Sequence, residues 1–124
     1  METHFTLTDA EFERLFESCS FDPALFTHEA HIRLAWIHIR KYGLDKASCN
    51  VVSQLQEYTT ALGVADKFDL GLTISSLRII NHFIMESTDS SFEMFIKEFP
   101  NLNTHFKDLL LQYPQLEKQD GIFV

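Results

Sequence analysis

The chain has 124 residues, the usual length of one folded domain and enough to bury a hydrophobic core. Its 18 acidic and 10 basic residues give a formal charge of −8, and such a surface repels nucleic acids and anionic membranes. No basic segment followed by an apolar run opens the chain, and no stretch approaches membrane-spanning length, so we expect a cytoplasmic protein without nucleic-acid or membrane partners.

Three helices are expected in the first half of the chain. Thr8 and Glu11 form a capping box, in which each side chain bonds the other residue's backbone amide, and apolar residues then recur at helical spacing. Thr27 caps a second helix, which Gly43 ends because glycine readily adopts the backbone conformation that follows a helix. A third helix covers about residues 45–62.

Two or three further helices are expected in the second half. A connector covers residues 65–72, and the next helix begins at Thr73. Ser90 and Glu93 form a second capping box, so another helix begins there. Proline cannot continue a helix, and two prolines set the remaining boundaries, Pro100 and Pro114.

These elements predict an all-α fold, a compact bundle of five to six mostly antiparallel helices in a single domain over residues 1–124. We expect an ordered core over about residues 8–114 and a C-terminal tail over residues 115–124. The terminal segments 4–8 and 121–124 could form short extended pieces. The apolar end of the tail either packs on the body or is left as an exposed apolar segment.

The second helix places histidines on its apolar side. At 100° per residue, His28, His31 and His38 lie within one continuous arc of apolar side chains, whereas Glu29 and Arg33 lie outside it. We therefore expect the three imidazoles to be buried and Glu29 to form a surface ion pair with Arg33, four residues later. An unpaired nitrogen on a buried ring costs about 1–3 kcal/mol, so other groups should contact these rings.

Three interpretations of these histidines stay open. Buried histidines are most often structural and bonded to backbone, hydroxyl groups or water. Alternatively, His28 and His31, three residues apart on one helical face, ligate a divalent metal such as zinc. Candidate third ligands are Asp69, then His105, then Asp66.

In the third interpretation the rings line a pocket for a small polar ligand, with His38, Trp36 and His105 in its wall. Trp36 lies at the edge of the arc, four residues before Arg40, where the pair either packs or covers a pocket mouth. Two histidines have no part in these sites: His4 belongs to a mobile terminus, and His82 lies on a solvated surface.

The pattern Phe26-x-His28-x-x-His31-x-x-x-Ala35-Trp36 resembles a family of small bacterial proteins without an assigned activity. The resemblance covers about residues 8–113 in order and spacing. It implies a bacterial, soluble, helical protein and implies no reaction.

A second block, Lys67-Phe68 with Leu72-Thr73, follows in the same order. In the family this block often has the form Lys-Tyr-His-x-Thr-x-Thr, so here Asp69 takes the place of a histidine. If the family histidine completes a metal site, the resemblance implies that Asp69 would coordinate a hard or borderline metal more weakly.

The sequence thus supports two classes of function and no specific reaction. The first is binding of a divalent metal or a small polar ligand at the histidine cluster. The second is a non-catalytic helical interaction module, or a homodimer, whose acidic surface and apolar tail contact a protein while the histidines are structural.

Overall fold

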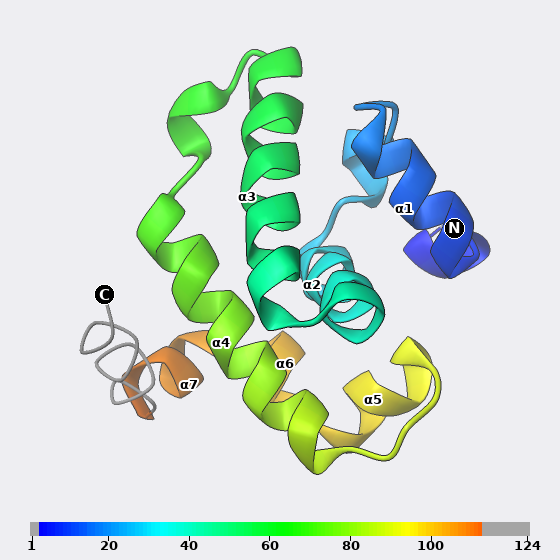
Figure 1. Cartoon of the computed structure of the whole chain (residues 1–124), viewed down its shortest axis with the longest axis vertical. Helices are drawn as coiled ribbons and strands as arrows, with labels where there is room; N and C mark the ends of the chain where they lie inside the picture. The colour runs from blue at the N-terminus through cyan, green and yellow to red at the C-terminus, as the bar shows by residue number, and fades with distance from the viewer. Residues whose placement is uncertain (1–2, 113–124) are drawn as a thin grey trace.

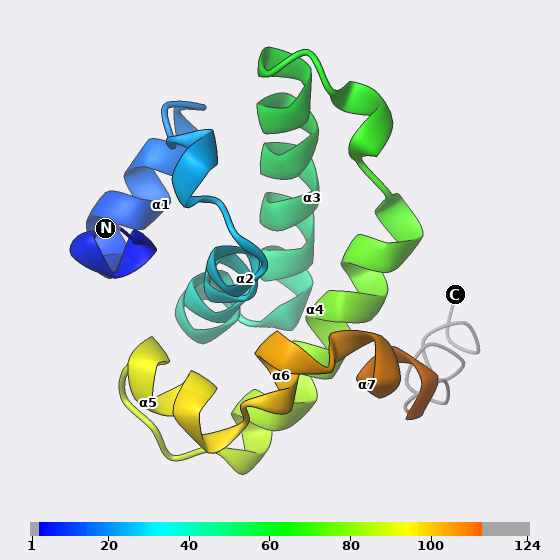
Figure 2. The same cartoon turned by 180° about the vertical axis from the view of Figure 1, so that it is seen from behind.

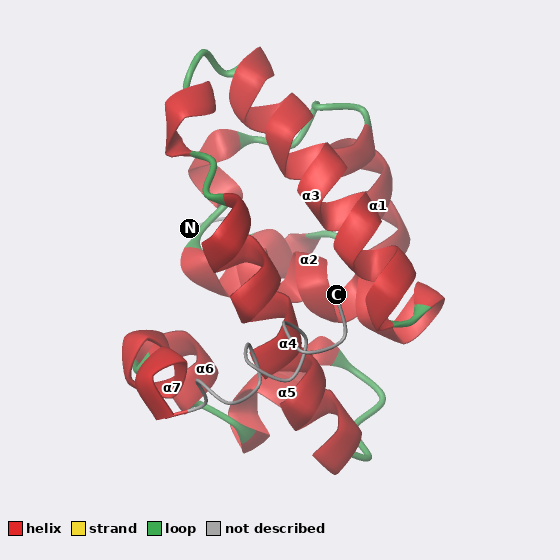
Figure 3. Cartoon of the chain, turned by 60° about the vertical axis from the view of Figure 1, so that its left-hand side comes forward, coloured by secondary structure: helices red, strands yellow, loops and turns green. Residues whose placement is uncertain are grey.

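The computed structural model describes residues 3–112, which form one helical domain without strands (Figure 3). The predicted all-α fold is therefore confirmed. The α-helices of this part of the chain are α1 (Asp9–Glu17), α2 (His28–Tyr42), α3 (Leu44–Ala61), α4 (Leu70–Glu86), α5 (Phe92–Glu98), α6 (Asn101–Thr104) and α7 (Phe106–Gln112). Short 3-10 turns occupy His4–Thr6, Pro23–Leu25 and Ala65–Lys67.

The second helix, α2, is the central element of the domain (Figure 1). It contacts α1, α3, α4 and α6. The helices α3 and α4 run in opposite directions, whereas α2 is seen nearly end-on in the same view and crosses them; the reverse view in Figure 2 agrees. Because neighbours cover α2 on several sides, every residue from Ile32 to Ile39 is buried.

Aromatic rings of α1, α3 and the loop between α1 and α2 form one end of the core. Phe12 and Phe16 of α1 are fully buried, and ring centroids lie 4.6 Å apart both for Phe12 with Phe21 and for Phe16 with Tyr58. The hydroxyl group of Tyr58 donates a 2.9 Å hydrogen bond to the carbonyl oxygen of Phe21. The buried phenol therefore has a partner, and this bond ties α3 to the loop after α1.

The predicted helix starts are confirmed at α1 and α2 and shifted at two later helices. The capping box of Thr8 and Glu11 is present, and the hydroxyl group of Thr27 accepts a hydrogen bond from the amide of Ala30. The starts of α4 and α5 differ from the prediction. The α4 helix begins at Leu70 rather than Thr73, and Ser91, not Ser90, caps α5.

A single residue, Gly43, joins α2 to α3. Its amide donates a 2.8 Å hydrogen bond to the carbonyl oxygen of Ile39, and its φ of 84° and ψ of 163° fall in a region open almost only to glycine. The chain can therefore turn sharply between α2 and α3, which pack against each other.

The last part of the described chain divides into two short helices where one was predicted. Pro100 ends α5 as expected, and α6 and α7 follow, each with one buried leucine, Leu102 and Leu109. The segment 4–8, predicted to be extended, instead contains the 3-10 turn His4–Thr6. The predicted tail at 115–124 and its extended end at 121–124 lie outside the described residues.

Candidate functional site

The two histidines considered as metal ligands lie on the first turn of α2. Both are exposed, so the prediction that His28 and His31 are buried is wrong. Nε2 of His28 lies 3.1 Å from the carbonyl oxygen of Leu102, and its ring packs edge-on against Phe106. The ring of His31 lies 5.1 Å from that of Phe26. A helical wheel fixes direction around the axis but not position along it, so a first turn can extend beyond the core.

The surroundings of His31 nevertheless favour its neutral form. Nearby protein atoms lower the pKa of His31 to about 4, with the adjacent His28 as the second cause. The residue as a whole is nevertheless exposed to solvent.

His38 is buried as predicted, with 1% of its surface exposed. Its Nδ1 lies 3.4 Å from the side-chain amide nitrogen of Asn50 on α3, and among the described residues its Nε2 has no hydrogen-bond partner. Burial lowers the pKa of His38, and the charge of Glu13 opposes this shift. The ring is thus held neutral between α2 and α3, which is a packing role.

The described residues do not assemble the proposed metal site. Asp69 accepts a 3.0 Å hydrogen bond from the amide of Leu72, so it caps α4. His105 is exposed, with Nδ1 at 2.7 Å from the hydroxyl oxygen of Thr104. Across residues 3–112, no group of three or more His, Cys, Asp and Glu side chains could hold a metal ion. Metal binding by His28, His31 and Asp69 therefore has no support in this range.

A charged cluster that was not predicted joins the N-terminal turn to α2. His4 was expected in a mobile terminus and Arg33 on the surface, but His4 is 1% exposed and Arg33 is 5% exposed. Both residues are therefore buried. Nε2 of His4 lies 2.8 Å from Oε1 of Glu29, and Nη2 of Arg33 lies 2.8 Å from Oδ1 of Asp9. The predicted surface pair of Glu29 with Arg33 is replaced by these two pairs.

One sequence signal could have placed Arg33 inside. Ile37 lies one helical turn after Arg33, and Ala30 lies one turn before it, on the same face. This face of α2 is apolar, and so is the arc that carries the histidines, so only a small part of the helix surface is suited to contact with solvent. That pattern is typical of a helix enclosed by protein.

A pocket of about 210 Å³ lies between the C-terminal half of α2 and the segment joining α4 to α5. Trp36, a predicted pocket residue, lines it; His38 and His105 do not. The guanidinium carbon of Arg40 lies 4.9 Å from the ring centre of Trp36, so this pair does border a pocket. The pocket is also lined by Ile84 near the end of α4 and by three residues that follow this helix, Ser87, Thr88 and Asp89.

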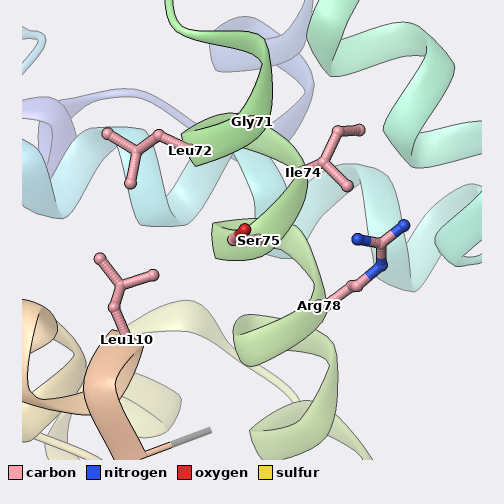
Figure 4. Close-up of a pocket in the computed structure, with 6 residues that line it drawn as sticks. All are labelled: Gly71, Leu72, Ile74, Ser75, Arg78 and Leu110. Carbon is pink, nitrogen blue, oxygen red and sulfur yellow. The ribbon is translucent and has the colours of Figure 1, made fainter. Parts of the chain in front are cut away.

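A second and wider hollow, the α4–α7 groove, has a volume of about 540 Å³ and is mainly apolar. In Figure 4, Leu72 of α4 and Leu110 of α7 project on the same side of α4. The remaining lining residues belong to α4: Gly71, Ile74, Ser75 and Arg78. Nothing in the sequence pattern predicted this groove, because it arises between two helices of separate segments.

Comparison of the chain with protein-family models, curated proteins and solved structures found no match. The family resemblance of the His28 to Trp36 motif therefore stays a prediction. Within the described part of the chain, no helix combines the length and apolar character that crossing a bilayer requires.

Proposed function

We propose that this protein is a non-catalytic interaction domain that binds an amphipathic helix of a partner protein in the α4–α7 groove. The observation that carries the proposal is an apolar groove lined by Leu72 and Leu110, with further exposed leucines near them in the sequence. Leu70 and Leu72 of α4 are 54% and 48% exposed, and Leu111 of α7 is 79% exposed. Neighbouring Leu110, which lines the groove, is only partly buried.

Leu72 differs from a scattered apolar residue of an ordinary surface because it lines a hollow. Burial of apolar surface contributes about 25 cal/mol per Å², and contiguous exposed apolar surface is typical of contact sites. The groove runs between two helices, Leu70–Glu86 and Phe106–Gln112, and is wide enough for aliphatic side chains. A third helix with leucine-like residues one turn apart would suit this arrangement.

Charge favours a different protein over a second copy as the occupant. The chain has a formal charge of −8, so two copies repel each other, whereas a helix with a basic polar face is attracted. The partner segment is accordingly aliphatic on one face and rich in lysine or arginine on the other. The histidines of α2 then have structural roles.

The proposal can be tested by NMR titration of the full chain with two model peptides of about four helical turns. Both carry leucines at helical spacing; one has lysines on the polar face, and the other has glutamates. We expect the leucine–lysine peptide to shift the backbone amide signals of Leu72, Ile74 and Leu110 saturably. The leucine–glutamate peptide should bind at least about tenfold more weakly.

Two variants separate groove binding from general attraction between charges. Leu72→Glu and Met94→Glu each add one negative charge at a half-exposed apolar position, but Met94 lies on α5, away from the groove. Leu72→Glu should weaken the leucine–lysine peptide about tenfold despite the added charge, and Met94→Glu should not. Equal effects of the two variants would contradict the proposal. If sedimentation equilibrium shows reversible dimers and Leu72→Glu abolishes them, the occupant of the groove is a second copy of this chain and not a partner helix.

A further inference from the structure

The pocket beside Trp36 and Arg40 carries groups of opposite charge that the proposed interaction surface does not use. It lies between the C-terminal half of α2 and residues 84–89 and is distinct from the α4–α7 groove. Its volume of about 210 Å³ is below the roughly 300–1,000 Å³ of pockets for drug-sized ligands, so its ligand is small.

Arg40 supplies a positively charged edge to this pocket. Its guanidinium group stacks over Trp36, which is 4% exposed and therefore fixed in the core. One nitrogen, Nη1, donates a hydrogen bond to the carbonyl oxygen of Asp89. Among the described residues, no other hydrogen bond of this guanidinium is found. A guanidinium group is planar, so its remaining N–H groups lie in one plane, the geometry that a carboxylate accepts.

The segment after α4 supplies a negatively charged edge. Asp89 lines the pocket, and its Oδ2 accepts a 2.9 Å hydrogen bond from the hydroxyl group of Ser87. A hydrogen bond shared with Asp89 is the main cause that raises the pKa of Glu98. The carboxylate of Asp89 attracts a cationic group and repels a ligand that carries only negative charge.

The third feature of the pocket is an apolar wall made by Trp36 and Ile84. A cation, a carboxylate and an apolar wall within one small pocket match a ligand with the complementary three parts. We propose that this pocket binds a small zwitterion, an α-amino acid with an aliphatic side chain. Its carboxylate pairs with Arg40, its ammonium group faces Asp89, and its side chain packs on Trp36.

The chain offers a direct signal for this site because Trp36 is its only tryptophan. L-Leucine added to the full chain should change the Trp36 fluorescence and the NMR signal of its indole N–H saturably. Leucinamide lacks the carboxylate, and 4-methylpentanoate lacks the ammonium group. Each analogue should bind at least about tenfold more weakly than leucine. Equal binding of 4-methylpentanoate and leucine would overturn the role of Asp89 and with it the zwitterion.

A pair of arginine variants tests the site itself. Arg40→Gln should weaken leucine at least about tenfold, whereas Arg14→Gln, an exposed position on α1, should leave it unchanged. The indole N–H signal also reports whether Arg40→Gln keeps its fold, since Trp36 lies in the core. No saturable change with leucine up to about 10 mM would overturn the proposal, and so would equal binding by the wild type and Arg40→Gln. Neither result bears on peptide binding in the α4–α7 groove.

Discussion

Nη1 of Arg33 donates a 3.2 Å hydrogen bond to Nδ1 of His4, inside the protein. Arginine has no acceptor atom, so Nδ1 of His4 must carry a lone pair, and the proton of the neutral ring lies on Nε2. That proton is then donated to Oε1 of Glu29, 2.8 Å away. The contact with Arg33 thus fixes the tautomer of His4 and links the N-terminal turn to α2.

The first prediction concerns the hydrogen bonds that depend on Arg33. Its guanidinium group also donates to the carbonyl oxygens of His4 and Leu7 and to the carboxylate of Asp9. Arg33→Met would leave buried acceptors without partners, so we expect the free energy of unfolding to fall by about 2–3 kcal/mol in urea denaturation. Arg14→Met, at an exposed position, should change it by about 0.5 kcal/mol or less. Similar losses in both variants would show that the cluster does not stabilise the fold.

The second prediction concerns acid. Burial lowers the pKa of His4 from its ordinary 6.5, with Arg33 acting in the same direction and Glu29 opposing. Above pH 6.5 the ring is neutral in both states, and stability is complete. As the pH falls below 6.5 the unfolded chain binds the proton first, so stability decreases until folded His4 also titrates. Protonation at Nδ1 would also place an N–H group against the Arg33 cation, which adds to the effect of burial.

Urea midpoints between pH 7 and pH 5 can measure this loss. We expect the free energy of unfolding to decrease over this range, by no more than about 1.4 kcal/mol per pH unit for each such histidine. His38 contributes in the same direction, because burial also lowers its pKa. His4→Gln removes one titrating ring and should reduce the slope, whereas His105→Gln, at an exposed residue, serves as the control. An unchanged slope in His4→Gln would contradict the assignment.

The third prediction compares two glycines with opposite backbone requirements. Gly43 has a φ of 84°, and a Cβ added there meets no atom within 4 Å, so only backbone strain opposes Gly43→Ala. We expect this variant to lose about 1–3 kcal/mol. Gly71 lies within α4, where an added Cβ comes only to 3.6 Å from Asp69, so Gly71→Ala should gain about 0.5–1 kcal/mol. Changes of the same sign in thermal or urea unfolding would refute this contrast.

Local chemistry explains which elements were predictable. The hydroxyl groups of Thr8 and Thr27 bond amides three residues away, so their pattern is readable in sequence. The start of α4 was missed because Gly71 weakens the helical pattern of its first turn, although Asp69 satisfies the amide of Leu72. The adjacent residues Ser90 and Ser91 are both suitable caps for α5, and the sequence does not show which one lies at the start of the helix. In the structure Ser91 is the cap.

The histidine cluster illustrates what local pattern cannot give. His28 and His38 lie on the same arc of α2, yet the first is exposed and the second is 1% exposed. The difference is their position along the helix, which depends on where α3 and α6 pack. Arg33 is the converse case, since the N-terminal turn covers a face that a helical wheel assigns to water.

The sequence by itself determined that the described part of this protein is helical and where its first three helices begin. These features depend on backbone geometry, caps and periodic apolar residues within a few positions of each other. Only the tertiary structure decided which polar side chains are enclosed and where hollows form. Burial and pockets depend on contacts between distant segments, such as His4 with Glu29 or Arg40 with Asp89, and no short-range pattern encodes those contacts.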